Sequence, residues 1–330
     1  MKDILNRLIN NQTLSRDEAK EVLTGLATGR YNNSQIAAFL TVYLMRAIRV
    51  EELEGFRDAM LELCNPVNLE GYNTIDVCGT GGDGKNTFNI STTASFVVAG
   101  AGVHVAKHGN YGVSSVSGSS NVLEYLGVRF SGDAIKMEES IDKSGICFMH
   151  APLYHPAMKN VGPVRKELGV KTFFNMLGPM VNPAFPPNQM VGVFSLELAR
   201  LYGYLYQNTG KKFSIVHALD GYDEVSLTGD FKFISVQREA LISPEELNLP
   251  RVSAEELYGG ESIEDAAVIF KDILANKGTM AQNAAVLANA GLAIATVHQS
   301  SISEGIAMAT ESLKSGAALE SFKKFLIINS

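Results

Sequence analysis

The chain has 330 residues, 46% of them hydrophobic and 19% charged, so it is long enough to bury one or two substantial cores. Its formal net charge of -7 argues against an extended nucleic-acid partner, because such binding depends on clustered Lys and Arg. We expect no membrane span, since no window offers about 18 uninterrupted apolar residues. Three cysteines in no metal-binding spacing indicate reduced thiols and a cytoplasmic location.

Residues 1–66 are predicted to form a small helical domain. A capping box between Ser15 and Glu18 opens one helix. A second helix is predicted to start at Ser34, and a third covers residues 51–63. The apolar residues of the second helix cover more than one face, as in a helix that is buried on two sides or forms a subunit contact. We therefore expect this domain to supply packing and a homodimer contact rather than ligand-binding groups.

From residue 72 the pattern changes to alternating strands and helices. This rhythm predicts a larger α/β domain over residues 72–330, with a mainly parallel central sheet and helices on both faces. The segment near residues 163–187 contains several prolines and breaks the rhythm, so we expect it to cross between the two domains. The last hundred residues are predicted to be helical again. The expected strands cover residues 72–78, 103–106, 146–150, 190–194 and 213–219.

A glycine-rich loop follows the first predicted strand. Its sequence, GTGGD at residues 79–83, allows positive φ angles and lets backbone N–H groups approach a ligand closely. Asn89 and Ser91 then precede a helical pattern, so a helix N-terminus is expected to face the same space. A strand, a glycine loop and a helix start together predict a phosphate-binding site.

Two further loops carry polar groups beside glycines. A strand is predicted to end one residue before Lys107, which would let the ammonium group reach a phosphate held by the first loop. A lone lysine is usually a solvated surface residue, but this context favours a functional one. Asn110 can donate and accept hydrogen bonds, as orienting a polar substrate requires. The small-residue loop over residues 113–120 contains Ser119, which is either a phosphate donor or part of a flexible loop.

Asp223 and Glu224 follow the end of a predicted strand. Carboxylate ligands without a nearby His or Cys favour Mg²⁺ over Zn²⁺. Taken alone, this pair is more often a solvated acidic turn, but beside a phosphate loop it becomes a plausible magnesium platform. Arg165 stands in the first turn of a short helix, where it is either a carboxylate clamp or an ordinary surface arginine.

These motifs occur together in a recognisable order. They are GTGGD at 79–83, NIST at 89–92, KHGN at 107–110, HPAM at 155–158, FNMLGP at 174–179 and DE at 223–224. Each is weak alone, but the six in register over the whole chain resemble the anthranilate phosphoribosyltransferase family. The resemblance implies a homodimer, with a helical domain and an α/β domain, that transfers the phosphoribosyl group of phosphoribosyl pyrophosphate to anthranilate in tryptophan biosynthesis. It also implies Mg²⁺, with two ions expected per subunit.

The resemblance assigns roles position by position. Those implied to bind phosphoribosyl pyrophosphate are Gly79, Gly82, Asp83, Thr87, Asn89, Ile90, Ser91, Thr92, Lys107 and Ser119. Those implied to bind anthranilate are Gly79, Asn110 and Arg165, and those implied to hold the metal are Ser91, Asp223 and Glu224. No residue is assigned as a general acid or base. The chain departs from the family at Lys171, where Arg is frequent, and at Asn121, where Asp is frequent.

Two other functions fit parts of the pattern. Pyrimidine nucleoside phosphorylases are similar in fold and in the KHGN motif, but they are generally longer and do not use an adjacent Asp-Glu pair for metal. A non-catalytic relative that binds nucleic acid would need a basic surface, which a chain at -7 does not suggest.

Overall fold

The computed structural model describes residues 1–112 and 116–330, which form two compact units. One unit consists of Met1–Pro66 and Ala151–Pro183, and the other of Val67–His150 and Ala184–Ser330. The second stretch of the helical unit starts at Ala151 rather than near residue 163. The reason is that this part of the chain already bonds to the first helices: Asn65 donates its N–H to the carbonyl of Tyr154 (2.8 Å), and the Asn160 amide donates to the carbonyl of Ala27 (2.6 Å).

The helical unit is built from four main helices and a set of short ones. The main helices are α1 (Lys2–Ile9), α2 (Arg16–Ala27), α3 (Asn33–Met45) and α4 (Val50–Glu62). The short ones are α8 (Ala151–Tyr154), α9 (Gly162–Leu168) and α10 (Phe174–Leu177), with 3₁₀ turns at Pro156–Lys159 and Gly178–Met180. The capping box predicted at Ser15 is confirmed. The predicted start of α3 at Ser34 was wrong, because Asn32 caps this helix by accepting the N–H of Gln35 (3.0 Å).

Glu52 is the buried polar centre of the helical unit. Its side chain has 0% exposure and forms an ion pair with Arg46. The same carboxylate accepts the Tyr43 hydroxyl (3.0 Å) and the N–H of Leu14 (3.0 Å). Around this network lie edge-to-face and stacked aromatic rings, including Phe56 and Phe173 with centroids 4.5 Å apart. A buried charge is tolerated here because all its neighbours are donors.

The α/β unit contains one seven-stranded sheet, in the order β3-β2-β1-β4-β5-β6-β7. Strands β1 to β5 pair in parallel, and β6 and β7 continue the sheet antiparallel. A mainly parallel sheet is therefore confirmed. The strands are β1 (Ile75–Gly79), β2 (Val105–Gly109), β3 (Ile146–His150), β4 (Asn188–Gly192), β5 (Lys212–Ala218), β6 (Phe231–Ser235) and β7 (Glu239–Ile242).

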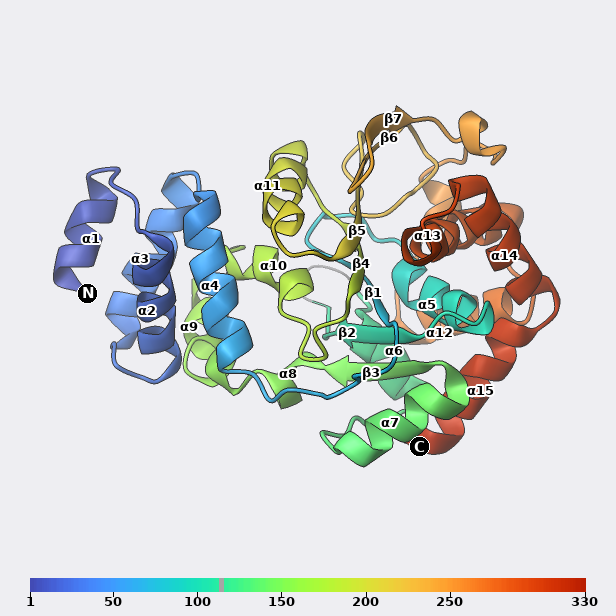
Figure 1. The fold of residues 1–330 in the computed structure, drawn as a ribbon, viewed down its shortest axis with the longest axis horizontal. Coiled ribbons are helices and arrows are strands. Elements are labelled where there is room, and N and C mark those ends of the chain that lie inside the picture. The colour runs from blue at the N-terminus through green and yellow to red at the C-terminus, as the bar shows by residue number, and fades with distance from the viewer. Residues whose placement is uncertain (113–115) are drawn as a thin grey trace. The chain divides into compact units, whose positions relative to one another are not determined.

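Helices cover both faces of this sheet. Figure 1 shows α11 on one side of the strands and α5, α13 and α14 on the other. The helices are α5 (Ile90–Gly100), α6 (Ser119–Tyr125), α7 (Ala134–Ser144), α11 (Leu196–Gln207), α12 (Ile263–Leu274), α13 (Met280–His298), α14 (Ile302–Lys314) and α15 (Ala317–Asn329). Among the described residues, α13 alone is long and apolar enough to cross a membrane, and 78% of its most apolar stretch is buried inside the unit, as in a core helix.

Two sequence predictions about this unit were wrong. The hairpin of β6 and β7 was missed in a region expected to be helical. Lys107 was expected just past the end of its strand, but β2 continues through it to Gly109. Pairing with β3 extends this strand, since Lys107 lies opposite Phe148 and Gly109 opposite His150.

Candidate active site

The strand order reverses between β1 and β4. From β1 the chain proceeds through β2 to β3 on one side, and it then returns to β4 and β5 on the other. In open parallel sheets such a switch point opens a crevice at the carboxyl ends of the strands, where ligands bind. The glycine loop predicted to hold phosphate begins here, directly after β1.

Gly79 and Gly192 end these two strands and lie opposite each other in the sheet. A side-chain carbon added to Gly79 would lie 2.3 Å from Oδ2 of Asp223, and one added to Gly192 would lie 1.4 Å from the carbonyl oxygen of Asp223. The segment carrying Asp223 therefore crosses directly over the ends of β1 and β4. Only residues without a side chain permit this approach, so Gly192 is a site-forming residue that the sequence did not reveal.

The two acidic residues bond to the groups predicted to bind phosphate. Gly81 of the glycine loop donates its N–H to Oδ2 of Asp223 at 2.6 Å. Ser91, in the first turn of α5, donates its N–H to Oε1 of Glu224 at 3.2 Å. Backbone N–H groups of a glycine loop and of a helix N-terminus attract anions. Asp223 and Glu224 accept hydrogen bonds from these N–H groups. The predicted metal ligands and the predicted phosphate donors therefore lie in one site.

The carboxylates of this site are crowded and poorly solvated. Burial, Glu224 and Asp83 raise the pKa of Asp223 well above its usual range. Burial and Asp83 likewise raise the pKa of Glu224 to about 7, against the opposing effects of the Ser91 N–H and of Lys107. Like charges held together in a dry site favour either protonation or a bound cation. This electrostatic pattern fits a divalent metal position.

Lys107 lies beneath this site rather than on its surface. Its side chain is 2% exposed, and its ammonium group donates to the carbonyl of Val77 in β1. Burial lowers its pKa, whereas Cys78, Asp76 and Glu224 act in the opposite direction. Lys107 therefore supplies positive charge from the floor of the sheet, close enough to influence Glu224.

The remaining residues predicted around the phosphate site occupy the glycine loop and the start of α5. Asp83 accepts the N–H of Lys85 (3.0 Å), and Thr87 forms an isolated bridge with Tyr258. Gly82 has a φ of 76°, which favours glycine. The side chains of Ile90 and Thr92 are buried, at 0% and 1% exposure, so these two residues offer backbone rather than side-chain groups.

A second loop pair lies beside the first. The Asn89 amide donates to the carbonyl of Ser117 at 3.0 Å. The Ser119 hydroxyl and the Ser120 N–H both donate to the carbonyl of Asn110, at 3.3 and 3.1 Å. Asn89 is thus bonded to Ser117, and Ser119 to Asn110, so separate hydrogen bonds hold the segment 117–120 at these predicted residues. Residues 113–115 of the predicted small-residue loop lie outside the described residues.

Arg165 belongs to the helical unit, in α9. Its guanidinium group lies 5.0 Å from the ring centroid of Phe174 and makes a long 3.4 Å contact with the Asn175 amide oxygen. Burial lowers its pKa, and it forms no ion pair within residues 1–112 and 116–330. A partly buried cation without a carboxylate partner is suited to an anionic ligand.

Sequence reasoning missed two further polar groups in the α/β unit. Asn289, 1% exposed in α13, accepts the N–H of Val225 (3.1 Å) and donates to its carbonyl (2.9 Å). The Asn289 side chain therefore bonds both the N–H and the carbonyl of Val225, the residue after Glu224, and fixes the backbone there. The buried hydroxyl of Thr80 has no hydrogen-bond partner in the described part of the chain, although it stands next to Gly79.

A separate cavity of about 540 Å³ lies in the same unit. It is lined by residues of β5, β6 and β7 and of the α13–α14 turn, including Lys212, Arg238 and Ser301. None of the predicted site residues lines it. The candidate site therefore stays at the switch point of the sheet, and this cavity is not part of it.

Comparisons with known proteins cover both units. Residues 2–64 match the model of the glycosyl transferase family, helical bundle domain, and residues 71–319 match that of the glycosyl transferase family, a/b domain. An anthranilate phosphoribosyltransferase from Christiangramia forsetii is 64% identical over 324 residues, covering 98% of each chain. One from Bacteroides thetaiotaomicron is 53% identical over 330 residues, covering 100% of this chain and 99% of the relative.

Solved structures give the same result. The anthranilate phosphoribosyltransferase of Thermus thermophilus superposes with a TM-score of 0.92 at 35% identity, covering 98% of both chains. The enzyme of Saccharomyces cerevisiae, solved in complex with PRPP and Mg, superposes with a TM-score of 0.89 at 26% identity and covers 98% of this chain and 96% of that one. With full-length matches at this identity, and with the six motifs in register, the chain belongs to the anthranilate phosphoribosyltransferase family.

Proposed function

We propose that this chain is an enzyme that transfers the phosphoribosyl group of phosphoribosyl pyrophosphate to the amine of anthranilate. The products are N-(5-phosphoribosyl)anthranilate and diphosphate, in tryptophan biosynthesis. The observation that carries the proposal is the convergence of the glycine loop, the start of α5 and the Asp223-Glu224 pair at the switch point of the sheet. Family membership supports the same reaction.

The donor is proposed to lie against the glycine loop and the start of α5. The N–H groups of Gly81 and Ser91 bond to carboxylate oxygens in this structure, and we propose that diphosphate oxygens bind near these donors. Lys107 adds charge from below, and the Ser119 loop is proposed to enclose the sugar phosphate. The full proposed donor set is Gly79, Gly82, Asp83, Thr87, Asn89, Ile90, Ser91, Thr92, Lys107 and Ser119.

Mg²⁺ fits the acidic part of this site. Asp223 and Glu224 are poorly solvated carboxylates, and burial and neighbouring carboxylates raise the pKa of each, which favours a bound cation at this position. No group of three or more His, Cys, Asp or Glu is assembled for a metal within the described residues, and Mg²⁺ usually binds through one or two carboxylates plus phosphate and water. We propose two ions per subunit, held by Ser91, Asp223 and Glu224. When bound, Mg²⁺ neutralises the charge that develops on the departing diphosphate.

The acceptor is proposed to bind against Gly79, Asn110 and Arg165. The guanidinium group of Arg165 lacks an ion-pair partner among the described residues and would hold the carboxylate of anthranilate. Asn110 would orient its polar edge. The aromatic amine of anthranilate is neutral at pH 7, so its attack on the anomeric carbon needs no strong base. The chain then acts by positioning both substrates and by stabilising negative charge on the leaving group.

We further propose a homodimer formed through the helical unit. Three large apolar side chains are exposed on α1 and α3: Ile9 at 66%, Leu44 at 45% and Met45 at 85%. Exposed apolar groups of this kind favour an interface. A cytoplasmic location is proposed as well, since Cys64, Cys78 and Cys147 are all free thiols.

A single assay tests the proposed reaction. The purified chain is incubated with anthranilate, phosphoribosyl pyrophosphate and Mg²⁺, and formation of phosphoribosyl anthranilate is followed. We expect turnover that needs all three components. Parallel reactions with uridine or thymidine plus phosphate serve as the control. Phosphorolysis there, with no product from anthranilate, would replace the proposal by a nucleoside phosphorylase.

A further inference from the structure

Lys85 follows the glycine loop by two residues, and its side chain reaches toward the loop that carries the acidic pair. Its ammonium group stands 4.5 Å from the centroid of the Tyr222 ring, which is within range of a cation–π interaction. The side-chain stem of Lys85 also passes close to Gly221, since a carbon added there would meet its Cε at 3.7 Å. Tyr222 is 4% exposed, so its ring is a fixed surface rather than a mobile one.

The two partners of this contact are directly connected to the candidate site. The N–H of Lys85 donates to Oδ1 of Asp83, a predicted donor-binding residue. Tyr222 immediately precedes Asp223, whose carboxylate accepts the N–H of Gly81. The Lys85 side chain therefore joins the phosphate-binding loop to the metal-binding loop at a second point, beyond the Gly81–Asp223 bond.

The charges around this contact explain why a cation is useful there. Burial and the carboxylates of Asp220, Asp83 and Glu255 raise the pKa of the Tyr222 hydroxyl, so acidic groups from three segments converge on this ring. Of these carboxylates, Asp83 also repels the Asp223-Glu224 pair and raises the pKa of both residues. Lys85 places a positive charge on the face of the ring that these carboxylates surround.

We propose that Lys85 is a positioning residue, whose side chain on the Tyr222 ring holds the glycine loop and the Asp223-Glu224 loop in the arrangement that binds Mg²⁺ and the diphosphate group together. This inference rests on the proposed function of the same site. It assigns Lys85 no contact with anthranilate and no role in the helical unit.

Four substitutions separate this role from simple loss of stability. Lys85→Met keeps the stem but removes the charge, whereas Lys85→Arg keeps both. Tyr222→Leu removes the ring, whereas Tyr222→Phe keeps it. We expect Lys85→Met and Tyr222→Leu each to raise the half-saturating Mg²⁺ concentration and the KM for phosphoribosyl pyrophosphate about three- to tenfold. The KM for anthranilate should stay within about twofold, and the Arg and Phe variants should resemble the unchanged protein.

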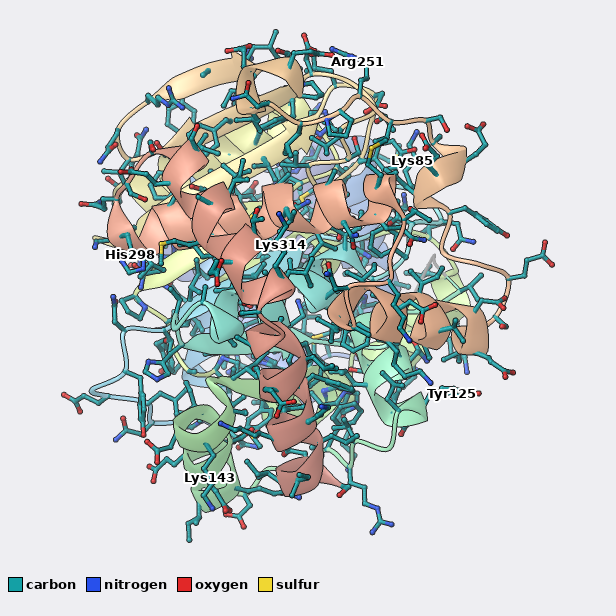
Figure 2. All side chains as sticks on the ribbon, turned by 90° about the vertical axis from the view of Figure 1, so that its right-hand side faces the viewer. Lys85, Tyr125, Lys143, Arg251, His298 and Lys314 are labelled. Atoms are coloured by element: carbon teal, nitrogen blue, oxygen red, sulfur yellow. The ribbon has the colours of Figure 1, made fainter. Side chains whose placement is uncertain are left out.

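Lys143→Met is the matched control. Lys143 is an exposed lysine with one side-chain partner, Glu139 at 2.6 Å, whereas Lys85 is half-buried. Figure 2 shows Lys143 at the lower left of the view and Lys85 at the upper right. Its substitution should leave both magnesium dependence and KM values unchanged. A double variant, Lys85→Met with Tyr222→Leu, should be no worse than either single variant, because both remove the same contact.

The closing experiment measures Mg²⁺-dependent binding of inorganic diphosphate to the full chain by calorimetry, alongside the activity assay. Weaker binding in Lys85→Met and Tyr222→Leu, non-additive in the double variant and restored by the Arg and Phe variants, supports the proposal. Additive losses, an Arg variant as poor as the Met variant, or equal rises in both KM values would overturn it. Because this measurement does not use anthranilate, failure of the proposed reaction shows up separately as missing product.

Discussion

Gly79→Ala tests whether the crossing of Asp223 over the strand end is essential. The added methyl group would lie 2.3 Å from Oδ2 and 2.9 Å from Cγ of the Asp223 carboxylate. To reach ordinary contact the carboxylate must withdraw by about 1 Å, which also breaks its 2.6 Å bond from the N–H of Gly81. The atoms that must move are the end of a side chain, so the fold itself can adapt.

The expected result is a large loss of activity with a small loss of stability. A displacement of about 1 Å in a metal ligand reduces turnover by roughly 100-fold, while local overpacking costs about 1 kcal/mol. Gly192→Ala should behave differently. There the new carbon meets the backbone oxygen of Asp223 at 1.4 Å, so the loop or the strand must shift and the unit should lose much of its stability.

The measurements are steady-state kinetics over a magnesium titration, magnesium-dependent diphosphate binding and thermal unfolding. Gly132→Ala is the control, because Gly132 has no atom within 4 Å of an added carbon and no left-handed φ. It should match the unchanged protein in every assay. If Gly79→Ala kept activity within about threefold at saturating Mg²⁺, the Asp223 carboxylate would not be needed at the position seen here.

Four other predictions follow from the same contacts. Asp223→Asn combined with Glu224→Gln should abolish most turnover yet leave thermal stability equal or higher, because it removes two crowded carboxylates; near-normal activity at saturating Mg²⁺ would contradict the metal role. Arg165→Ala should raise the KM for anthranilate far more than that for the donor, and equal effects on both would refute its assignment as a carboxylate clamp. Folding raises the pKa of Glu224 from 4.5 to about 7, so its contribution to the free energy of unfolding is complete below pH 4.5 and is lost by pH 7, a change of about 3 kcal/mol. Mg²⁺ should therefore raise the unfolding temperature more at pH 8 than at pH 5.5. A shift that does not depend on pH would argue against this carboxylate as a ligand. Glu52→Gln should destabilise the helical unit by about 3 kcal/mol in urea unfolding, since the buried Arg46 guanidinium loses its counter-charge, and an unchanged midpoint would show that the pair contributes nothing.

Local signals predicted much of the secondary structure correctly. The capping box of Ser15 and Glu18 marks the start of α2, because this effect acts within a few residues. The strand at Ile146–His150 was predicted with the correct bounds from its continuous apolar run. Such features depend on neighbours in the chain, which the sequence displays directly.

Long-range pairing accounts for the errors. The β6–β7 hairpin is held in place because Phe231 and Phe233 pair with residues of β5, which lies outside the region expected to be helical. Lys107 reads as a loop residue until the pairing of β2 with β3 extends the strand through it. In both cases the deciding partner is distant in the sequence.

The sequence alone determined the inventory of the site: a glycine loop, a helix start, a lysine, an acidic pair and an arginine, in an order specific enough to indicate the family. Only the tertiary structure decided how the members of this inventory that lie in the α/β unit meet. It placed Asp223 across Gly79 and Gly192, bonded Glu224 to the start of α5, buried Lys107 beneath them and laid Lys85 on Tyr222. The physical reason is that residue types report which chemistry is possible, whereas distances between charges arise from packing and strand order that no local pattern encodes.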